Sequence, residues 1–213
     1  MRVAAKVSMA LGVLLVLGAI SLLLYNQWDT NRATQAATQV ADALTVQISS
    51  AKVKTDAAAE PGANAEPGAE AGIGEETAQL DGEMPVIAVN GDEYVGVLEI
   101  PALGLSLPVM EGWSYQKLKT APCRFSGSIY TDDIVIMAHN YSGHFGGISS
   151  LVPGDTVKFL DAEGTELSYT VVLLETVGAN DVEEMIYSEY DLTLFTCTYS
   201  GEARIALRCK AVA

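Results

Sequence analysis

A run of 19 residues without a charged side chain, Val7–Tyr25, limits the fold of this chain more than any other feature. A helix rises about 1.5 Å per residue, so this run spans about 28 Å, close to the thickness of a bilayer core. Arg2 and Lys6 precede the run and Asp29 follows it, which places the N-terminus in the cytosol by the positive-inside rule. We therefore expect residues 1–28 to form a single-pass anchor in the cell membrane, with the following domain extracellular. The alternative is a cleaved signal peptide, but the run ends in Leu-Leu-Leu-Tyr-Asn, which lacks the small residues of a cleavage site.

The segment after the anchor has the periodicity of a helix. Val40, Leu44 and Ile48 recur every four residues within residues 31–54, a stretch otherwise rich in Ala, Gln and Thr. This spacing predicts a helical stalk.

A linker follows the stalk, so that the two together occupy residues 29–83. Residues 56–83 contain eight acidic residues and no basic one, with the tetrapeptide Ala-Glu-Pro-Gly occurring twice. Proline, glycine and like charges prevent a packed core, so this composition predicts an extended, solvated linker. The linker either gives the chain reach from the membrane or has no function of its own. We expect the folded domain to begin at Met84 and to fold without residues 26–83.

Residues 84–213 have the size of an ordinary domain and the composition of a β protein. Apolar runs separated by turn residues predict short strands and few helices. The expected strands are Tyr94–Ile100, Leu105–Val109, Ile134–Ala138, Thr156–Asp161, Leu167–Glu175, Leu192–Cys197 and Ala203–Val212. This pattern is typical of an all-β sandwich or closed barrel.

Charge and composition exclude several classes of function. The formal net charge of −15 argues against nucleic acid as a partner, because phosphate binding needs a basic face. Neither a phosphate-binding loop nor a CxxC or HExxH motif occurs, so we expect no cofactor and no metal site. Cys123 and Cys209 could form a disulfide outside the cell, but we favour two free thiols, with Cys209 packed in the last strand.

Three residues at strand ends could carry chemistry. Cys197 ends the strand Leu192–Cys197, His139 follows the apolar run Ile134–Ala138, and Arg204 lies near the start of the last strand. A cysteine in such a place is usually packed in the core, but a nearby cation favours the nucleophilic thiolate. Together the three indicate covalent acyl transfer, in which the thiolate attacks a carbonyl, the imidazole protonates the leaving amine and the guanidinium holds the oxyanion.

A second arginine competes with Arg204. If the last hairpin turns at Ser200–Gly201, Cys197 faces Arg204 and Thr193 faces Arg208. Arg208 then lies ~13 Å further along the strand. We expect Arg204 to reach a substrate at Cys197, and substitution of Arg208 to reduce activity far less.

A second histidine competes with His139. His144 lies in a glycine-flanked loop, whereas the backbone of His139 is fixed by its strand. A proton donor must be held within hydrogen-bond reach of the reacting group, so we expect His139 to be the acid/base.

Three segments resemble the sortase family. They are Leu192–Cys197 with Arg204, Met137–Gly146 around His139, and Leu98–Val109, and the similarity runs through about residues 94–212. The resemblance implies a closed eight-stranded β-barrel with short helices. It also implies a cysteine transpeptidase of Gram-positive cell surfaces, with Cys197 as nucleophile, His139 as acid/base and Arg204 as stabilising cation. Such enzymes cut a C-terminal sorting motif of secreted proteins, often of the Leu-Pro-x-Thr-Gly type, and transfer the protein through a thioester to an amine of a peptidoglycan precursor or a pilin.

The class of sortase stays open, as do two other functions. No Asp-Pro-aromatic lid precedes residue 94 and no second hydrophobic segment follows the barrel, which weakens a pilin-polymerase interpretation. The connection between Glu175 and Leu192 is too short for the long helix of class B. A non-catalytic surface binding module and a cysteine hydrolase that uses water as acceptor remain alternatives. For Trp113 and Tyr115 we favour packing on the barrel over a position in a substrate groove.

Overall fold

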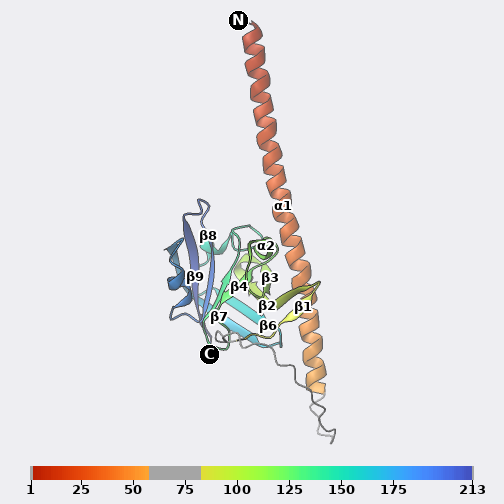
Figure 1. Ribbon diagram of the computed structural model, residues 1–213, viewed down its shortest axis with the longest axis vertical. Helices are drawn as coiled ribbons and strands as arrows, with labels where there is room; N and C mark the ends of the chain where they lie inside the picture. Colours follow the sequence, from red (N-terminus) through yellow and green to blue (C-terminus); the bar gives the residue numbers. More distant parts are fainter. Residues whose placement is uncertain (1, 58–82, 213) are drawn as a thin grey trace, which may run out of the picture.

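The computed structural model describes residues 2–57 and 83–212. The first range is one continuous helix, α1 (Arg2–Ala57), and the second forms a β-barrel beside its C-terminal half (Figure 1). The predicted stalk therefore lies within α1, and most of the predicted linker, residues 58–82, lies outside the described residues.

The strands of the described residues form one sheet that closes on itself. Its order is β1-β2-β3-β4-β5-β8-β9-β7-β6, and β2 also pairs with β6. Eight strands therefore make a closed barrel, as predicted, and β1 extends it as a short hairpin with β2. The strands are β1 (Ile87–Val89), β2 (Asp92–Ile100), β3 (Leu105–Met110), β4 (Cys123–Ser126), β5 (Ile134–Met137), β6 (Thr156–Asp161), β7 (Glu166–Gly178), β8 (Leu192–Cys197) and β9 (Ala203–Ala211).

Short helices occupy the connections between strands. They are α2 (Tyr115–Leu118) between β3 and β4, α3 (Val182–Ile186) between β7 and β8, and the 3₁₀ turns η1 (Pro101–Leu103) and η2 (Ile148–Ser150). Ser114 caps α2, because its side chain accepts a hydrogen bond from the backbone N–H of Lys117 at 3.1 Å. Alternate residues of the strands point inward and fill the barrel with aliphatic and aromatic side chains such as Leu98, Phe159 and Tyr169.

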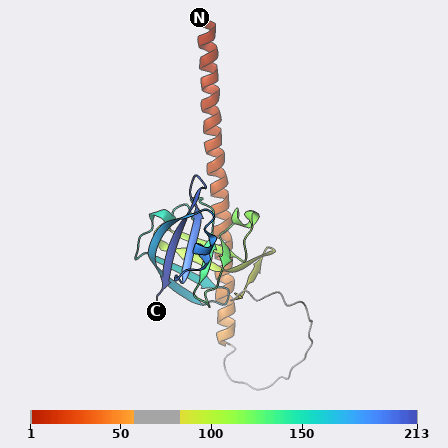
Figure 2. The same cartoon turned by 60° about the vertical axis from the view of Figure 1, so that its left-hand side comes forward.

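The stalk packs on the barrel, which the sequence analysis did not anticipate. Ala37, Ala41, Leu44 and Ile48 are all at most 2% exposed. They lie four, three and four residues apart, so they form one stripe along the helix. Both views place this part of α1 against the sheet, near β2 and β3 (Figure 1, Figure 2). These four side chains are therefore part of the hydrophobic core.

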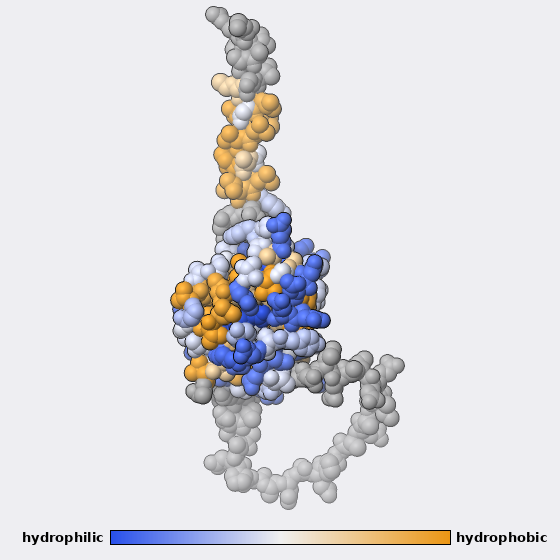
Figure 3. Space-filling model, turned by 90° about the vertical axis from the view of Figure 1, so that its left-hand side faces the viewer, coloured by the Kyte–Doolittle hydropathy of each residue, from blue (hydrophilic) through white to orange (hydrophobic). Residues whose placement is uncertain are grey.

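The N-terminal part of α1 extends away from the barrel. Its apolar side chains are largely exposed between Leu11 and Leu24, and they form a hydrophobic surface above the barrel, whose own face in this view has both hydrophilic and hydrophobic areas (Figure 3). Taking only the residues whose side chains the structure describes, no helix has the length and apolar character needed to cross a membrane.

The three cysteines are free. Cys123 lies in the cluster between α1 and the barrel, whereas Cys209 lies in the barrel interior, and both are fully buried. Burial raises the pKa of the Cys123 thiol to about 11 and that of Cys209 to about 12. The expectation that Cys123 and Cys209 do not pair is confirmed.

Candidate active site

Cys197, His139 and Arg204 lie at the ends of three adjacent strands. β5 and β8 are parallel neighbours with Met137 opposite Phe195, so His139 and Cys197 each follow this pair by two residues. Neighbouring strands are ~4.8 Å apart, which places the two residues side by side. β9 lies on the other side of β8 and carries Arg204 directly opposite Cys197.

The register of the last hairpin agrees with the sequence prediction. Cys197 pairs with Arg204 and Thr193 with Arg208. The turn is closed by a hydrogen bond from the Thr198 N–H to the Ala203 carbonyl at 3.0 Å, and Gly201 has a φ of 76°, which favours glycine.

Two hydrogen bonds fix the backbone next to His139 to β8. The Ala138 N–H donates to the Phe195 carbonyl at 3.2 Å, and the Thr196 hydroxyl donates to the Ala138 carbonyl at 2.8 Å. Thr196 is 2% exposed, so water does not compete for this bond. Although β5 ends at Met137, the position of His139 relative to Cys197 is therefore set by direct bonds between the two strands.

The three residues line one cavity of about 250 Å³. Its walls are mainly apolar and come from β4, β5, β8, α2 and α3. The apolar lining residues are Leu118, Phe125, Met137, Val182, Met185 and Phe195, with Trp113 and Tyr115 at the side of α2. Trp113 and Tyr115 thus line the cavity, the alternative that the sequence analysis did not favour, while the Trp113 ring also lies 6.0 Å from that of Phe125 on β4. Such a cavity suits a short apolar peptide segment held over a nucleophile.

The imidazole of His139 is held against an aromatic ring. Its ring centroid lies 4.9 Å from that of Tyr141, and the planes are inclined by 30°. Burial, and secondarily the positive charge of Lys119, lower the pKa of His139 below its ordinary value. His139 is therefore mostly neutral at pH 7 and can accept a proton.

His144 lies behind this pair, with its ring centroid 5.6 Å from that of Tyr141. It is fully buried, and burial together with the charge of His139 lowers its pKa to about 4. His144 is not among the residues that line the cavity. The structure thus brings His139, and not His144, to Cys197.

The two arginines of β9 have different surroundings. Arg204 is partly exposed and donates only to the carbonyls of Gly201 and Ala203, at 3.2 and 3.1 Å, and it makes no ion pair with any described carboxylate. Arg208 is 2% exposed and pairs with Glu175 at 2.7 Å. It also donates to the Thr193 hydroxyl and the Glu184 carbonyl, which ties α3 to the sheet. Arg204 is available to a ligand and Arg208 is not.

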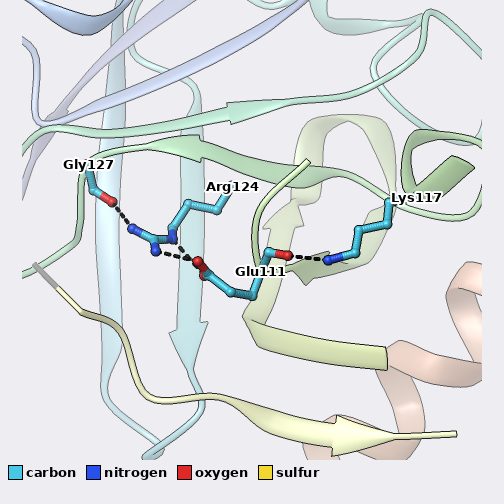
Figure 4. A network of polar contacts seen from close by, with 4 residues as sticks. All are labelled: Glu111, Lys117, Arg124 and Gly127. Atoms are coloured by element: carbon cyan, nitrogen blue, oxygen red, sulfur yellow. Dashed lines mark hydrogen bonds and ion pairs between the residues drawn. The ribbon is translucent and has the colours of Figure 1, made fainter. Parts of the chain in front are cut away.

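Polar contacts hold the connection between β3 and β4, which carries the cavity residues Trp113 and Tyr115 (Figure 4). The guanidinium of Arg124, on β4, forms a bidentate ion pair with Glu111, which follows β3. Arg124 also donates to the Gly127 carbonyl at 2.7 Å, and Lys117 of α2 donates to the Glu111 carbonyl at 2.6 Å. Nothing in the sequence points to this network, because Glu111 and Arg124 are 13 residues apart and share no motif.

The apolar stripe of α1 was partly visible in the sequence. The spacing of Val40, Leu44 and Ile48 indicated a helix, but only the addition of Ala37 and Ala41 outlines a face that packs on the barrel. Small side chains let a helix approach a sheet closely, and alanines gave no such indication in an alanine-rich segment.

Comparison with known proteins identifies the family. The family model described as Sortase domain matches residues 98–212, more than half of the chain. The chain belongs to the sortase family. The matched range contains Cys197, His139 and Arg204, and it covers the barrel from within β2 to β9.

One curated sortase is a detectable relative. Sortase D of Bacillus subtilis (strain 168) is 29% identical over 116 residues, which make up 51% of this chain and 58% of the relative. The chain thus spans just over half the length of that protein.

Solved sortase structures share the fold. Sortase C1 from Streptococcus agalactiae superposes with a TM-score of 0.52 at 24% identity, covering 59% of this chain and 71% of that one. Sortase C2 of pilus island 1 from group B Streptococcus gives a TM-score of 0.50 at 22% identity, covering 56% and 74%. At these identities the likeness supports the barrel fold and no finer assignment.

Proposed function

We propose that this sortase-family chain is a cysteine transpeptidase that uses Cys197 as nucleophile, His139 as acid/base and Arg204 as stabilising cation. The observation that carries the proposal is the meeting of these three residues at the ends of β5, β8 and β9, at one apolar cavity. A structural cysteine would not need a histidine and an unpaired guanidinium beside it.

The geometry supports a two-step acyl transfer. His139 takes the proton of the Cys197 thiol, and the sulfur attacks the carbonyl carbon of the scissile peptide bond. Arg204 donates to the oxyanion that develops on the carbonyl oxygen. The C–N bond then breaks, His139 gives its proton to the leaving amine, and the acyl group remains on Cys197 as a thioester. An incoming amine then attacks the thioester carbonyl and forms a new amide bond while the C–S bond breaks. The proton that the amine loses passes through His139 to the sulfur of Cys197, which restores the thiol.

The family suggests the substrate class. We infer that the peptide is a C-terminal sorting motif of the Leu-Pro-x-Thr-Gly type in a secreted protein, because the apolar walls around Phe125, Met185 and Phe195 suit a leucine and a proline. The acceptor is an amine of a peptidoglycan precursor or of a pilin. The lack of a partner for Arg204 among the described side chains leaves it able to hold the substrate carbonyl.

The same proposal includes attachment to the cell membrane. The uncharged run Val7–Tyr25 falls within α1, and its described apolar side chains are not covered by the barrel. With Arg2 and Lys6 inside, the barrel faces the cell exterior. Protease added to intact protoplasts should degrade the barrel, and a protected barrel would contradict this topology.

The test of the activity is a mass-spectrometric assay on the purified full chain. A panel of sorting-motif peptides is incubated with and without triglycine as amine acceptor. A transpeptidase gives an acyl adduct on Cys197 and, with triglycine, the ligated peptide. Hydrolysed peptide alone would favour the hydrolase, and neither adduct nor product would favour a non-catalytic binding module.

Variants decide the roles of the residues. Cys197→Ala should give neither adduct nor product, whereas Cys209→Ala, a cysteine removed from the barrel interior, should retain the adduct if it folds. A folded Cys197→Ala chain that still forms the acyl intermediate would refute the assignment of the nucleophile.

A further inference from the structure

The stripe of α1 shares a hydrophobic cluster with the barrel wall next to the cavity. Ala41, Leu44 and Ile48 are at most 2% exposed and pack in one cluster with barrel residues of β2, β3, α2 and β4. The barrel members of this cluster are Tyr94, Val97, Met110, Leu118, Ala121 and Cys123. These residues form a continuous apolar contact surface for the helix. Displacing the helix from this surface would expose all these side chains to water.

The segment that connects β3 and β4 lies between this contact surface and the cavity. Trp113, Tyr115, Leu118 and Phe125 line the cavity that holds Cys197. Leu118 is 3% exposed and belongs to both groups, because it lines the cavity and packs in the α1 cluster. We call these four cavity-lining residues the α2 wall. A displacement of α1 therefore removes support from this wall of the candidate active site.

The sheet holds this wall at its ends. β4 pairs with β5 at three positions, but β3 and β4 share a single pair of residues, Met110 and Cys123, and the segment between them, which carries α2, has no place in the ladder. α2 is only one turn long. Between these ends the segment is held by its own short-range hydrogen bonds, by side-chain packing in the α1 cluster, and by the contacts of Glu111 with Arg124 and Lys117 (Figure 4).

We propose that α1 is a positioning element for catalysis: Leu44 and Ile48, acting through Leu118, hold the α2 wall in the shape that binds substrate. The stalk is then a part of the working enzyme and not a passive tether. The docking and the coupling to the wall are properties of the fold, and only the effect on turnover rests on the proposed function.

Docking of α1 can be measured without any substrate. Full-length Cys197→Ala carries two thiols, and Cys123 lies under α1 while Cys209 lies inside the barrel. In this background we compare two variants. Leu44→Asp places a charge in the buried contact surface, and the control Val46→Asp places it on the exposed side of the same helix, where Val46 is 65% exposed. A methanethiosulfonate reagent and mass spectrometry of the two cysteine peptides give the labelling rates.

Leu44→Asp should expose Cys123 alone. Loss of burial returns the pKa of Cys123 from about 11 to the ordinary ~8.5, so its labelling rate should rise at least ~100-fold near pH 7. Cys209 should stay protected, and Val46→Asp should match the parent chain at both thiols. Slow labelling of Cys123 in Leu44→Asp would show that α1 does not cover this wall and would overturn the proposal.

The shape of the wall has its own readout. The sequence has two tryptophans, so Trp28→Phe leaves Trp113, at the cavity, as the single tryptophan, which can be excited selectively over the tyrosines. Leu44→Asp should change the emission and acrylamide quenching of Trp113, and Val46→Asp should not. If Cys123 becomes reactive while Trp113 is unchanged, α1 docks on the barrel but does not position the wall, and the proposal fails.

The third measurement, after thiol labelling and tryptophan fluorescence, is turnover. With Cys197 present, Leu44→Asp should reduce kcat/KM for the sorting peptide at least ~10-fold, mainly through KM, because the wall contacts the substrate and not the reacting atoms. An unchanged kcat/KM in a chain with altered Trp113 would refute the catalytic role. A parent chain that processes no peptide refutes the proposed function instead, while the thiol and fluorescence measurements still decide the docking.

Leu44→Asp could unfold the barrel, which exposure of Cys209 would reveal. In that case Leu44→Ala, which removes packing without adding charge, takes its place under the same criteria.

Discussion

Substitutions of the two arginines of β9 should have opposite effects, one on activity and the other on stability. Arg204 lies opposite Cys197 and contacts only carbonyls of its own turn. Arg208 lies four residues further along and is fixed by Glu175, Thr193 and the Glu184 carbonyl. We therefore expect Arg204→Ala to lose activity with little loss of stability, and Arg208→Met to do the reverse.

The cost of Arg208→Met follows from its contacts. Methionine keeps the apolar stem but makes none of the hydrogen bonds to Glu175 at 2.7 Å, Thr193 at 3.0 Å and Glu184 at 2.8 Å. Breaking a fully buried ion pair costs about 3–5 kcal/mol of unfolding free energy. The Glu175 side chain is 35% exposed and regains water, which reduces the expected cost to about 2–3 kcal/mol. For a protein of this size the melting temperature should fall by about 4–12 °C.

The expected change for Arg204→Ala is in rate. A group that holds an oxyanion contributes roughly 100-fold or more to turnover, so peptide cleavage should fall at least ~100-fold. Its partly exposed side chain has no described carboxylate partner, so unfolding free energy should change by less than ~1 kcal/mol.

Calorimetry and peptide cleavage, measured on both variants below their melting temperatures, test the pair. The reasoning fails if Arg208→Met keeps the melting temperature of the parent while losing ~100-fold in rate, because Arg208 would then serve the substrate. It fails equally if Arg204→Ala cleaves peptide at the parent rate.

Three further outcomes are expected. His139→Ala should lose at least ~100-fold in cleavage rate and His144→Ala far less, with circular dichroism to confirm folding; a dead, folded His144 variant beside an active His139 variant would reverse the assignment. Burial lowers the pKa of folded His144 to about 4 while the unfolded imidazole titrates near ~6.5, so the unfolded chain gains its proton first as pH falls. Stability from this group should be complete above pH ~6.5 and decline by about 3 kcal/mol towards pH ~4; His144→Phe should lack this loss in urea titrations, and parallel curves would contradict it. Arg124→Ala should raise KM more than it lowers kcat, because Arg124 holds the wall through Glu111 and does not line the cavity; a selective loss of kcat would contradict that role.

The register of the last hairpin was predictable from the sequence. A turn at Ser200–Gly201 fixes which residues of two antiparallel strands face each other, because side chains alternate with a period of two. Placing Arg204 opposite Cys197 therefore needed only local information. The choice of His139 over His144 followed from the same kind of argument, since a residue next to an apolar strand has a fixed backbone.

Other features depend on contacts between distant segments. β5 and β8 are parallel neighbours although 54 residues separate the end of one from the start of the other, so no turn rule predicts that His139 lies beside Cys197. The resemblance to sortases supplied that neighbourhood. The ion pair of Glu111 with Arg124 had no indication in the sequence. A position of Trp113 in the cavity wall was one of two possibilities, between which the sequence could not decide.

The sequence by itself determined the apolar run of α1, the positions of seven of the nine described strands and the residues able to carry acyl transfer, because periodicity and side-chain chemistry are properties of neighbouring residues; the short strands β1 and β4 were not predicted. It suggested a stalk and a barrel that fold separately. Only the tertiary structure shows that the two pack together: the stripe from Ala37 to Ile48 is buried on the outside of the barrel beside β2 and β3, and its cluster includes Leu118. An apolar face on a helix shows that something must cover it, but which surface covers it depends on the shape of both partners, and only the folded chain brings these together.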